Sequence, residues 1–464
     1  MALLPAMLGA SGTSYGLPGD AAALGRVQLH RSYNRGVPYM PLAQQGASAG
    51  TAALSAQVIR SFSLDGDPLQ NVYANLRPID VDGDGRFEFV QWNGFRFMQV
   101  WSADGRKLWR IEDPAGRLND ERQGVLRDTA AVLDLDGDGK QDIAHCWVQG
   151  GQRRLVYRRG LDGRVITSVP IDGGLSRLCQ IAAFDTAERG TLILVAQSNR
   201  IASACAHNYT DSWARTVAYD VAQRVVWDRA TCDAGHFVYP LDENGDGKVE
   251  GIQVGKYLLR PDGSLRCQLT PWVPGDHVDT LATADLDPAR PGLETVAVGL
   301  TGAAMFSASD CHQIWRLPGN VVVNPQHVTV AKLDPASATP LIVIHEKAST
   351  VRPTMFFVNG QGRILHRLDT GIMPMQNANL DGALGTDELV ASFGVVLDQL
   401  GRTRLSESWY WRLKGDRVHE TNQGPFPASF DRWQAFPLVF DVDGDGRDEI
   451  VQWSQSLVVI GKVR

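Results

Sequence analysis

The chain has 464 residues, of which 44% are apolar, 21% charged and 8% aromatic, a globular composition that excludes disorder for most of the chain. No stretch approaches 18 consecutive apolar residues, so we expect no membrane-spanning helix. With 45 basic and 52 acidic residues, a net charge of −7 and no dense Lys/Arg block, a nucleic-acid partner is not expected.

The N-terminal region differs in composition from the rest of the chain. Its first ten residues form a short apolar run with no basic residue before it, so they resemble a secretion signal only poorly. We interpret residues 1–25 as a leader or a poorly ordered segment and residues 26–464 as one folded domain.

An acidic, glycine-rich segment recurs along that domain. Four strong copies begin at Asp80, Asp134, Asp242 and Asp441, and we call them the first to fourth acidic loops. Weaker copies begin at Asp185, Asp285, Asp334 and Asn379, which gives eight units with a mean step of about 52 residues.

The order of features inside each unit predicts β-structure. The acidic loop leads into an apolar run, a second run follows, and an Asp-Gly or Asn-Gly pair such as Asp104-Gly105 then precedes a third. That third run often ends in tryptophan, as at Trp109, Trp227 and Trp315. No segment shows sustained helical periodicity, so a unit is about four short strands, the size of a propeller blade.

We therefore predict an all-β fold, a single propeller with four-stranded blades. Eight blades are preferred and seven are the alternative if one weak copy is only a loop. The last unit supplies two strands before the chain ends, so strands from the region Arg26 to Leu64 are expected to complete it. A two-sheet sandwich is less favoured because the period is so regular.

The acidic loops carry oxygen ligands at positions 1, 3, 5 and 9, with glycines at positions 4 and 6, a pattern that suits calcium. An EF-hand would need Glu at position 12, where this chain has Gln91, His145, Gln253 or Gln452. The loops are similar to the calcium loops of integrin-type FG-GAP propellers. The expected calcium ligands are Asp80, Asp82, Asp84 and Glu88; Asp134, Asp136, Asp138 and Asp142; Asp242, Asn244, Asp246 and Glu250; and Asp441, Asp443, Asp445 and Glu449. We expect these ions to be structural.

Three histidines occupy one place in consecutive units. His236, His277 and His327 precede the acidic segments at Asp242, Asp285 and Asp334 by six to eight residues. The run between each histidine and its loop should be the innermost strand, so the three imidazoles are expected to meet near the axis. They could hold zinc, with Cys267 or Cys311 nearby, or form a substrate pocket.

A polar, aromatic stretch starting at His207 and Tyr209 suits a sugar, which it could stack on and hydrogen-bond. Arg229 is a candidate for binding an acidic substrate, and a Cys205–Cys232 disulfide would fix this region. The six cysteines permit three disulfides in an oxidising compartment, which favours a secreted or periplasmic protein.

Two stretches carry a more specific resemblance: 235–263, which starts Gly-His-Phe-Val-Tyr-Pro-Leu-Asp, and 275–294, which contains Asp-Pro-Ala-Arg-Pro-Gly-Leu-Glu. They resemble the propeller polysaccharide lyases that act on rhamnogalacturonan and ulvan. The resemblance implies β-elimination at a uronate, in which a cation or Arg neutralises the carboxylate, a His or Tyr removes the C5 proton and an acid protonates the leaving oxygen. The residues offered for these roles are His145, His207, Tyr209, Arg229 and His236.

Two other functions stay open, a non-catalytic carbohydrate-binding or adhesion propeller and a glycoside hydrolase acting next to a uronate. No GxSxG or HExxH motif supports a serine esterase or a zincin. The expected partner is an acidic polysaccharide or oligosaccharide, and we expect a monomer.

Overall fold

The computed structural model describes residues 54–63, 75–93, 97–112, 130–149, 152–171, 179–198, 213–236, 238–272, 276–334, 336–337, 339–346, 354–369, 374–382, 387–391, 395–398, 403–406, 418–421, 424–427, 438–443, 445–453 and 457–463. Within these residues the chain forms strands, turns and bends and no helix, and hence no helix that could cross a membrane. The predicted leader, residues 1–25, lies outside the described residues.

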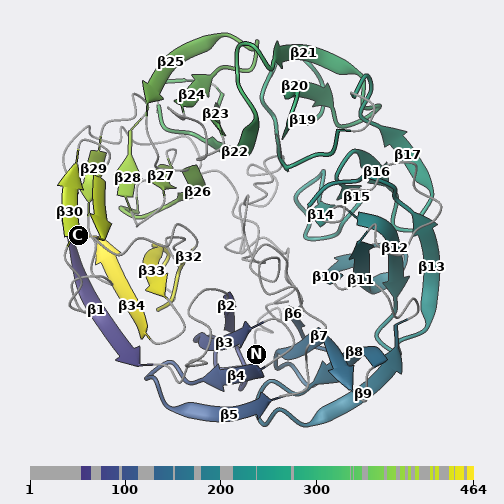
Figure 1. The fold of residues 1–464 in the computed structure, drawn as a ribbon. Coiled ribbons are helices and arrows are strands. Elements are labelled where there is room, and N and C mark those ends of the chain that lie inside the picture. The colour runs from purple at the N-terminus through teal and green to yellow at the C-terminus, as the bar shows by residue number, and fades with distance from the viewer. Residues whose placement is uncertain are drawn as a thin grey trace, which may run out of the picture.

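Eight antiparallel four-stranded sheets stand in a ring around a central axis (Figure 1). The prediction of an all-β, eight-bladed propeller is confirmed. A separate hairpin of β30 (Val418–Thr421) and β31 (Gly424–Pro427) follows the seventh blade.

Strands are given from the inner to the outer edge of each blade. Blades 1 to 4 are β2 (Asn75–Ile79), β3 (Glu88–Asn93), β4 (Phe97–Trp101) and β5 (Lys107–Glu112); β6 (Ala130–Leu133), β7 (Asp142–Gln149), β8 (Gln152–Arg158) and β9 (Val165–Pro170); β10 (Cys179–Thr186), β11 (Gly190–Ser198), β12 (Trp213–Tyr219) and β13 (Val225–Ala230); β14 (Val238–Leu241), β15 (Gly251–Val254), β16 (Tyr257–Leu259) and β17 (Leu265–Gln268).

Blades 5 to 8 continue in the same way around the ring. They are β18 (Thr280–Ala284), β19 (Glu294–Gly299), β20 (Gly302–Ser307) and β21 (Gln313–Pro318); β22 (Pro325–Ala331), β23 (Leu341–Glu346), β24 (Thr354–Val358) and β25 (Ile364–Asp369); β26 (Pro374–Ala378), β27 (Glu388–Ala391), β28 (Val395–Leu397) and β29 (Thr403–Ser406); β32 (Leu438–Phe440), β33 (Glu449–Trp453), β34 (Leu457–Val463) and β1 (Ala56–Ser63).

The closure of the ring corrects the expected strand count of the last blade. Its three inner strands come from the C-terminal region, and only the outermost strand, β1, comes from the N-terminal region, where it pairs antiparallel with β34 (Figure 1). Phe62 of β1 packs with Phe89 of blade 1 and with Phe440 and Val451 of blade 8, so the joint has its own apolar core.

Apolar side chains of neighbouring blades pack on each other throughout the ring. One core cluster, for example, combines Ile79 and Val90 of blade 1 with Ala130 and Ile143 of blade 2. Because each sheet face is covered by the next blade, central strands such as β4 and β19 are buried along their whole length.

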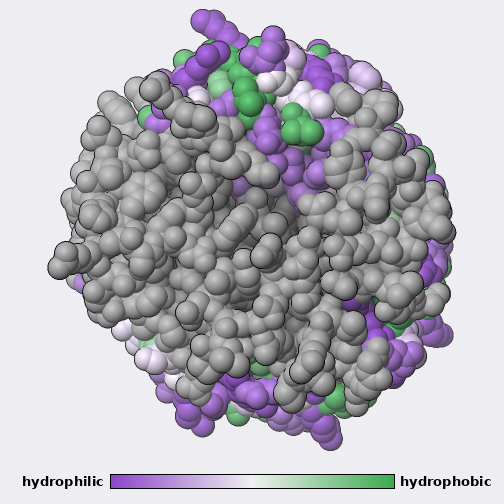
Figure 2. All heavy atoms as spheres, in the orientation of Figure 1, coloured by the Kyte–Doolittle hydropathy of each residue, from purple (hydrophilic) through white to green (hydrophobic). Residues whose placement is uncertain are grey.

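The two ends of the ring differ in chemistry. In every blade the first strand runs toward the end that carries the acidic loops, which directly follow it, and we call this the acidic-loop end. His236 and His277 precede β14 and β18 and therefore lie toward the opposite end, which we call the histidine end. Where described residues form the surface near the top of Figure 2, they are mostly hydrophilic as the surface hollows toward the centre.

Candidate functional site

A backbone contact between blades 4 and 5 brings two of the predicted histidines together. Gly235 forms a parallel bridge with Val278, and the His236 N–H donates to the Val278 carbonyl over 3.2 Å. A Cβ on Gly235 would lie 2.2 Å from that carbonyl oxygen, and its φ is +129°, so this close approach requires glycine. The glycine before the first histidine is thus what sets the two histidine segments side by side.

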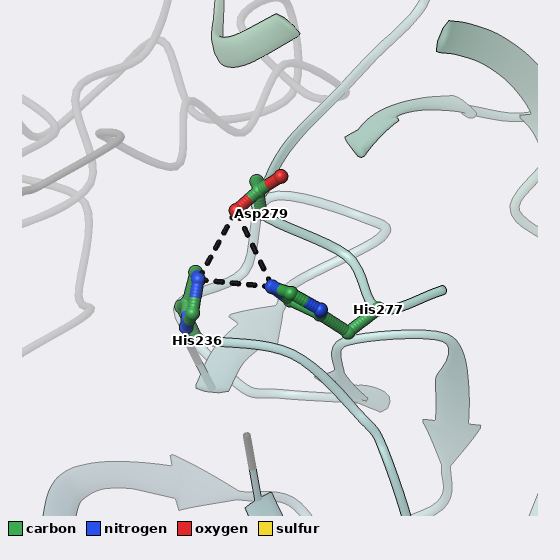
Figure 3. Close-up of side chains that lie close together, drawn as sticks. All are labelled: His236, His277 and Asp279. Atoms are coloured by element: carbon green, nitrogen blue, oxygen red, sulfur yellow. Dashed lines mark hydrogen bonds and ion pairs between the residues drawn. The ribbon is translucent and has the colours of Figure 1, made fainter. Parts of the chain in front are cut away.

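Three ligand-type atoms converge there (Figure 3). The two Nε2 atoms of His236 and His277 lie 3.2 Å apart, and Asp279 Oδ1 lies 3.1 Å from the first and 3.4 Å from the second. The side chains are 13%, 13% and 6% exposed, so the group is largely enclosed but open at the imidazoles. We call His236, His277 and Asp279 the His–His–Asp cluster.

The electrostatics of the cluster favour an ionised carboxylate. Burial acts to raise the pKa of Asp279, but hydrogen bonds and charge interactions with His236 and His277 outweigh it and hold that pKa well below its ordinary value. A buried anion faced by two imidazole nitrogens can bind a cation or hold a proton between its members.

The shape of the cluster fits a metal ion. Two nitrogens bound to tetrahedral zinc at 2.0–2.1 Å would lie about 3.3 Å apart, close to all three edges of the triangle. The carboxylate oxygen carries lone pairs, and each Nε2 carries one when the ring proton is on Nδ1, so all three atoms could bind one cation. Two imidazoles and a carboxylate are a donor set that suits zinc.

The third predicted histidine does not join the cluster. His327 lies on β22, is 1% exposed, and has its ring centroid 6.4 Å from that of His345. Burial and the charge of His345 lower the pKa of His327 well below its ordinary value, although Asp279 opposes them, so it stays neutral. Asp279 stands where a third imidazole was expected; its signal in the sequence was its position two residues after His277 along an extended segment.

Cysteine thiolates do not contribute either, which corrects that expectation. Cys267 and Cys311 form a disulfide between blades 4 and 5, so neither sulfur is free to bind zinc. A second disulfide, Cys146–Cys179, joins blades 2 and 3. The predicted partner of Cys232, Cys205, lies outside the described residues.

Two residues offered for catalysis lie elsewhere in the fold. His145, on β7, is 1% exposed and its Nε2 accepts a hydrogen bond of 3.0 Å from Arg158 Nε, while burial lowers its pKa well below the ordinary value. Arg229 lies on β13, the outermost strand of blade 3, and donates to the Gly263 carbonyl of the next blade over 2.8 Å. Both contacts serve the blade structure, and neither side chain faces the cluster.

His207 and Tyr209 lie outside the described residues. The described chain resumes after them at Trp213, whose N–H donates to the Gly235 carbonyl over 3.1 Å, while Ala234 N–H donates back to Trp213 over 3.2 Å. The described chain therefore resumes directly beside Gly235, the residue that precedes His236.

A lysine near the cluster was missed by the sequence reasoning. Lys256 occupies the tight turn between β15 and β16 at the histidine end, and its backbone N–H donates to the Ala234 carbonyl over 3.1 Å. Burial lowers the pKa of Lys256, while the charges of Asp233 and Asp276 oppose the shift. Its backbone is therefore bonded to a residue that precedes His236 by two positions. No motif in the sequence marks this lysine.

The first three acidic loops share one backbone arrangement. In the first loop both oxygens of Asp80 accept backbone N–H groups, from Gly83 at 2.7 Å and Gly85 at 3.0 Å, and Glu88 accepts from Val81 at 3.2 Å. The second and third loops repeat these bonds, and in each loop carboxylates at positions 1, 9 and either 3 or 5 come within reach of one ion. Calcium binding by these loops stays a prediction.

The ninth position of each loop is electrostatically strained. Burial and the neighbouring carboxylates raise the pKa of Glu88, Asp142 and Glu250 to about 7 each, against partial relief from backbone hydrogen bonds. In the fourth loop burial also raises the pKa of Glu449, but hydrogen bonding to Lys462 opposes it. The first three loops thus hold negative charge that a cation would stabilise.

No protein-family model matches the chain. In sequence it is 26% identical to rhamnogalacturonan endolyase YesW of Bacillus subtilis, over 47% of this chain and 42% of that enzyme. It is 27% identical to rhamnogalacturonan exolyase YesX of the same species, over 50% of this chain and 45% of that enzyme. The match thus spans less than half of the length of these curated relatives.

Solved structures show the same fold. The match to the YesX structure covers 91% of this chain, with a TM-score of 0.58 and 17% sequence identity. The match to a Bacillus licheniformis rhamnogalacturonan lyase covers 88% of this chain, with a TM-score of 0.59 and 18% sequence identity. The match to the V. cholerae biofilm matrix protein Bap1 covers 88% of this chain, with a TM-score of 0.55 and 12% sequence identity. The chain is therefore a β-propeller that is similar in sequence to rhamnogalacturonan lyases.

Proposed function

We propose that the protein is a secreted polysaccharide lyase that cleaves a uronate-containing glycan of the rhamnogalacturonan type by β-elimination at the histidine end. The observation that carries the proposal is the convergence of His236, His277 and Asp279 beside the inner strands of blades 4 and 5, on the stretch where this chain resembles the lyases. The sequence similarity to two rhamnogalacturonan lyases supports the same class.

The first requirement of β-elimination is neutralisation of the uronate carboxylate. The C5 proton of a uronate is weakly acidic, and its removal places negative charge on the adjacent carboxylate. A cation held by the His–His–Asp cluster would supply that neutralisation. Asp279 is ionised and keeps both imidazoles turned to one point, which prepares the cluster to bind a cation without reorganising its side chains.

Proton transfer is the second need, and we assign it to the segment between β11 and β12. His207 and Tyr209 are the proposed base and acid, because the described chain resumes after them at Trp213, beside Gly235. Lys256 is proposed to contact the acidic sugar, since it is a half-buried cation at the same end of the ring. These assignments replace His145 and Arg229.

The test is incubation with rhamnogalacturonan, ulvan and gum arabic while following the ultraviolet absorbance of the unsaturated product. Rising absorbance on rhamnogalacturonan supports the proposal. New reducing ends without absorbance would select a hydrolase, and binding with neither change would select a carbohydrate-binding or adhesion propeller; either result contradicts it.

A matched pair of variants tests the site. His236→Ala should lower turnover by at least about 100-fold, as expected on losing a group that organises the transition state, with a change in unfolding free energy of roughly 1 kcal/mol. His312→Ala is the control, because that ring is 55% exposed on an outer turn and pairs only with Asp310. Equal activity in both variants would remove the cluster from the mechanism.

The remaining features of the proposal concern the setting. Two disulfides between neighbouring blades suit an oxidising compartment, so we propose a secreted or periplasmic location. Calcium in the first three acidic loops is proposed as structural only, because those loops lie at the opposite end from the cluster. We propose that the protein acts as a monomer.

A further inference from the structure

The fourth acidic loop differs from the other three in what stands at its centre. Lys462 Nζ lies 2.8 Å and 3.0 Å from the two oxygens of Asp443, 2.8 Å from Asp445 Oδ2 and 2.9 Å from Glu449 Oε1. Those three carboxylates occupy positions 3, 5 and 9, the positions that would bind an ion. From this arrangement we infer that the Lys462 ammonium is the permanent cation of the fourth loop, which consequently binds no calcium.

The loop backbone itself is that of a cation-binding loop. Asp441 accepts from Gly446 N at 2.8 Å and Glu449 accepts from Val442 N at 2.7 Å, as the corresponding residues do in the first loop. Asp441 also accepts from Asp445 N at 3.1 Å, whereas in the first loop the matching oxygen accepts from Gly83 at position 4. The fourth loop therefore has carboxylates at the same positions as the first two loops and two of their three backbone hydrogen bonds to positions 1 and 9. Its difference lies in the residue that supplies the positive charge.

The ammonium is well matched to this position. Lysine offers three N–H donors and the loop presents three carboxylates, so each donor has a partner. Lys462 is 18% exposed and Glu449 is fully buried, which places the contacts in a partly dry setting where charge pairs are stronger than on an open surface. A calcium ion needs six to eight oxygens at 2.3–2.6 Å, and these oxygens surround a point that Nζ already fills.

The strand register explains why, among the described residues of the four acidic loops, the fourth alone has this lysine. Ile450 of β33 pairs with Gly461 of β34, so Lys462 is the next residue along and lies across from Glu449. In the other three blades, the residue that lies across from the position-9 carboxylate is Ser102 in blade 1, Arg159 in blade 2 and Pro261 in blade 4. Serine and proline carry no charge, and Arg159 pairs with Asp162 of its own turn at 3.6 Å.

The position-9 carboxylates of the other loops agree with this reading. Among the residues that the structure describes, no lysine or arginine forms an ion pair with Glu88, Asp142 or Glu250. The first three loops therefore need an external cation to balance their charge, whereas the fourth is balanced by its own strand.

The experiment is to count bound calcium per chain by equilibrium dialysis, at a free calcium concentration that saturates the wild type. Lys462→Met removes the ammonium at similar size, so we expect it to bind one calcium more than the wild type. Lys140→Met is the matched control, because that lysine belongs to the second loop and forms no ion pair with any residue that the structure describes, and its count should be unchanged. An unchanged count in Lys462→Met would overturn the inference.

A second pair tests the wild-type loops directly and does not depend on Lys462→Met folding well. Asp82→Ala in the first loop should lose one calcium, whereas Asp443→Ala at the same position of the fourth loop should lose none. Loss of one ion in Asp443→Ala would overturn the inference. Neither count depends on lyase activity, so a failure here is separate from a failure of the proposed function.

Melting temperatures give an independent measurement. Without calcium, Lys462→Met should melt below the wild type, since three carboxylates face each other without a cation, and calcium should raise its melting temperature more than that of the wild type. A calcium response equal to that of the wild type would contradict the inference.

Discussion

The position of His145 shows how one residue can look functional in the sequence and serve the core in the structure. It stands three residues after the ninth position of the second loop, where the other strong repeats have Gln91, Gln253 and Gln452. All four side chains are buried on the second strand of their blades. The position is thus a polar core position that glutamine usually fills.

This gives a prediction for a single substitution. His145→Gln should keep activity within about twofold and lower the free energy of unfolding by about 1 kcal/mol, because the glutamine oxygen can accept the hydrogen bond of Arg158 that His145 Nε2 accepts now. The measurements are initial rates and chemical denaturation. Lost activity at unchanged stability would return His145 to the list of catalytic groups.

At the scale of elements, the outer strands are fastened to the next blade by a repeated contact. Trp109, Trp227 and Trp315 each donate their indole N–H to a carbonyl in the outer turn of the following blade, at 2.6 Å, 2.9 Å and 2.9 Å. Their rings cover glycines with positive φ, such as Gly263 at +80°, and between blades 4 and 5 the Cys267–Cys311 disulfide takes the place of the ring. The tryptophans and Asp-Gly turns noted separately in the sequence are two halves of one contact.

A pair of glycine substitutions can measure that contact. At Gly263 a Cβ would lie 2.5 Å from the ring of Trp227, whereas at Gly190, with φ +66°, it would meet nothing within 4 Å. Both alanine variants carry the cost of a left-handed backbone, about 1 kcal/mol, and only Gly263→Ala must also move the ring. We expect Gly263→Ala to be less stable than Gly190→Ala by a further 1–2 kcal/mol, roughly, in denaturant unfolding. Equal losses would mean that the ring contributes little.

For the whole molecule, the acidic loops make stability depend on pH and on calcium together. The pKa of Glu88 rises from 4.5 to about 7 and that of Asp142 from 3.8 to about 7 on folding, so the folded protein without calcium binds these protons more tightly than the unfolded chain. The resulting stability is complete below about pH 4 and is lost as the pH rises through 7.

Protein stripped of calcium on a chelating resin should therefore melt lower at pH 8 than at pH 5, by on the order of 5 °C. Saturating calcium should abolish that fall, because it binds the ionised carboxylates. Scanning calorimetry at both pH values, with and without calcium, makes the comparison. If the melting temperature without calcium does not depend on pH, the raised pKa values are wrong. If calcium does not change the melting temperature, the loops bind no calcium.

The sequence predicted those parts of the molecule that repeat. Seven of the eight acidic positions follow the first strand of a blade and the eighth, Asp185, lies near the end of β10, because an Asp/Gly turn after an apolar run is a local signal. Contacts that depend on strand register and on the packing of blades leave no local pattern in the sequence, so they were not predicted. Asp279 reaches the two histidines through the Gly235–Val278 bridge, and Lys462 reaches the fourth loop from a strand that starts eight residues after the loop ends.

The way β1 joins β34 has a consequence for synthesis. The first strand that the structure describes pairs with the last one, so β1 has no partner until β34 has been synthesised, nearly four hundred residues later. Until then β1 must wait as an unpaired ribbon, and the blades between must stack as an open arc. An unpaired strand edge can associate with other chains, so we expect the joining of β1 to β34 to be a late and aggregation-sensitive step of folding.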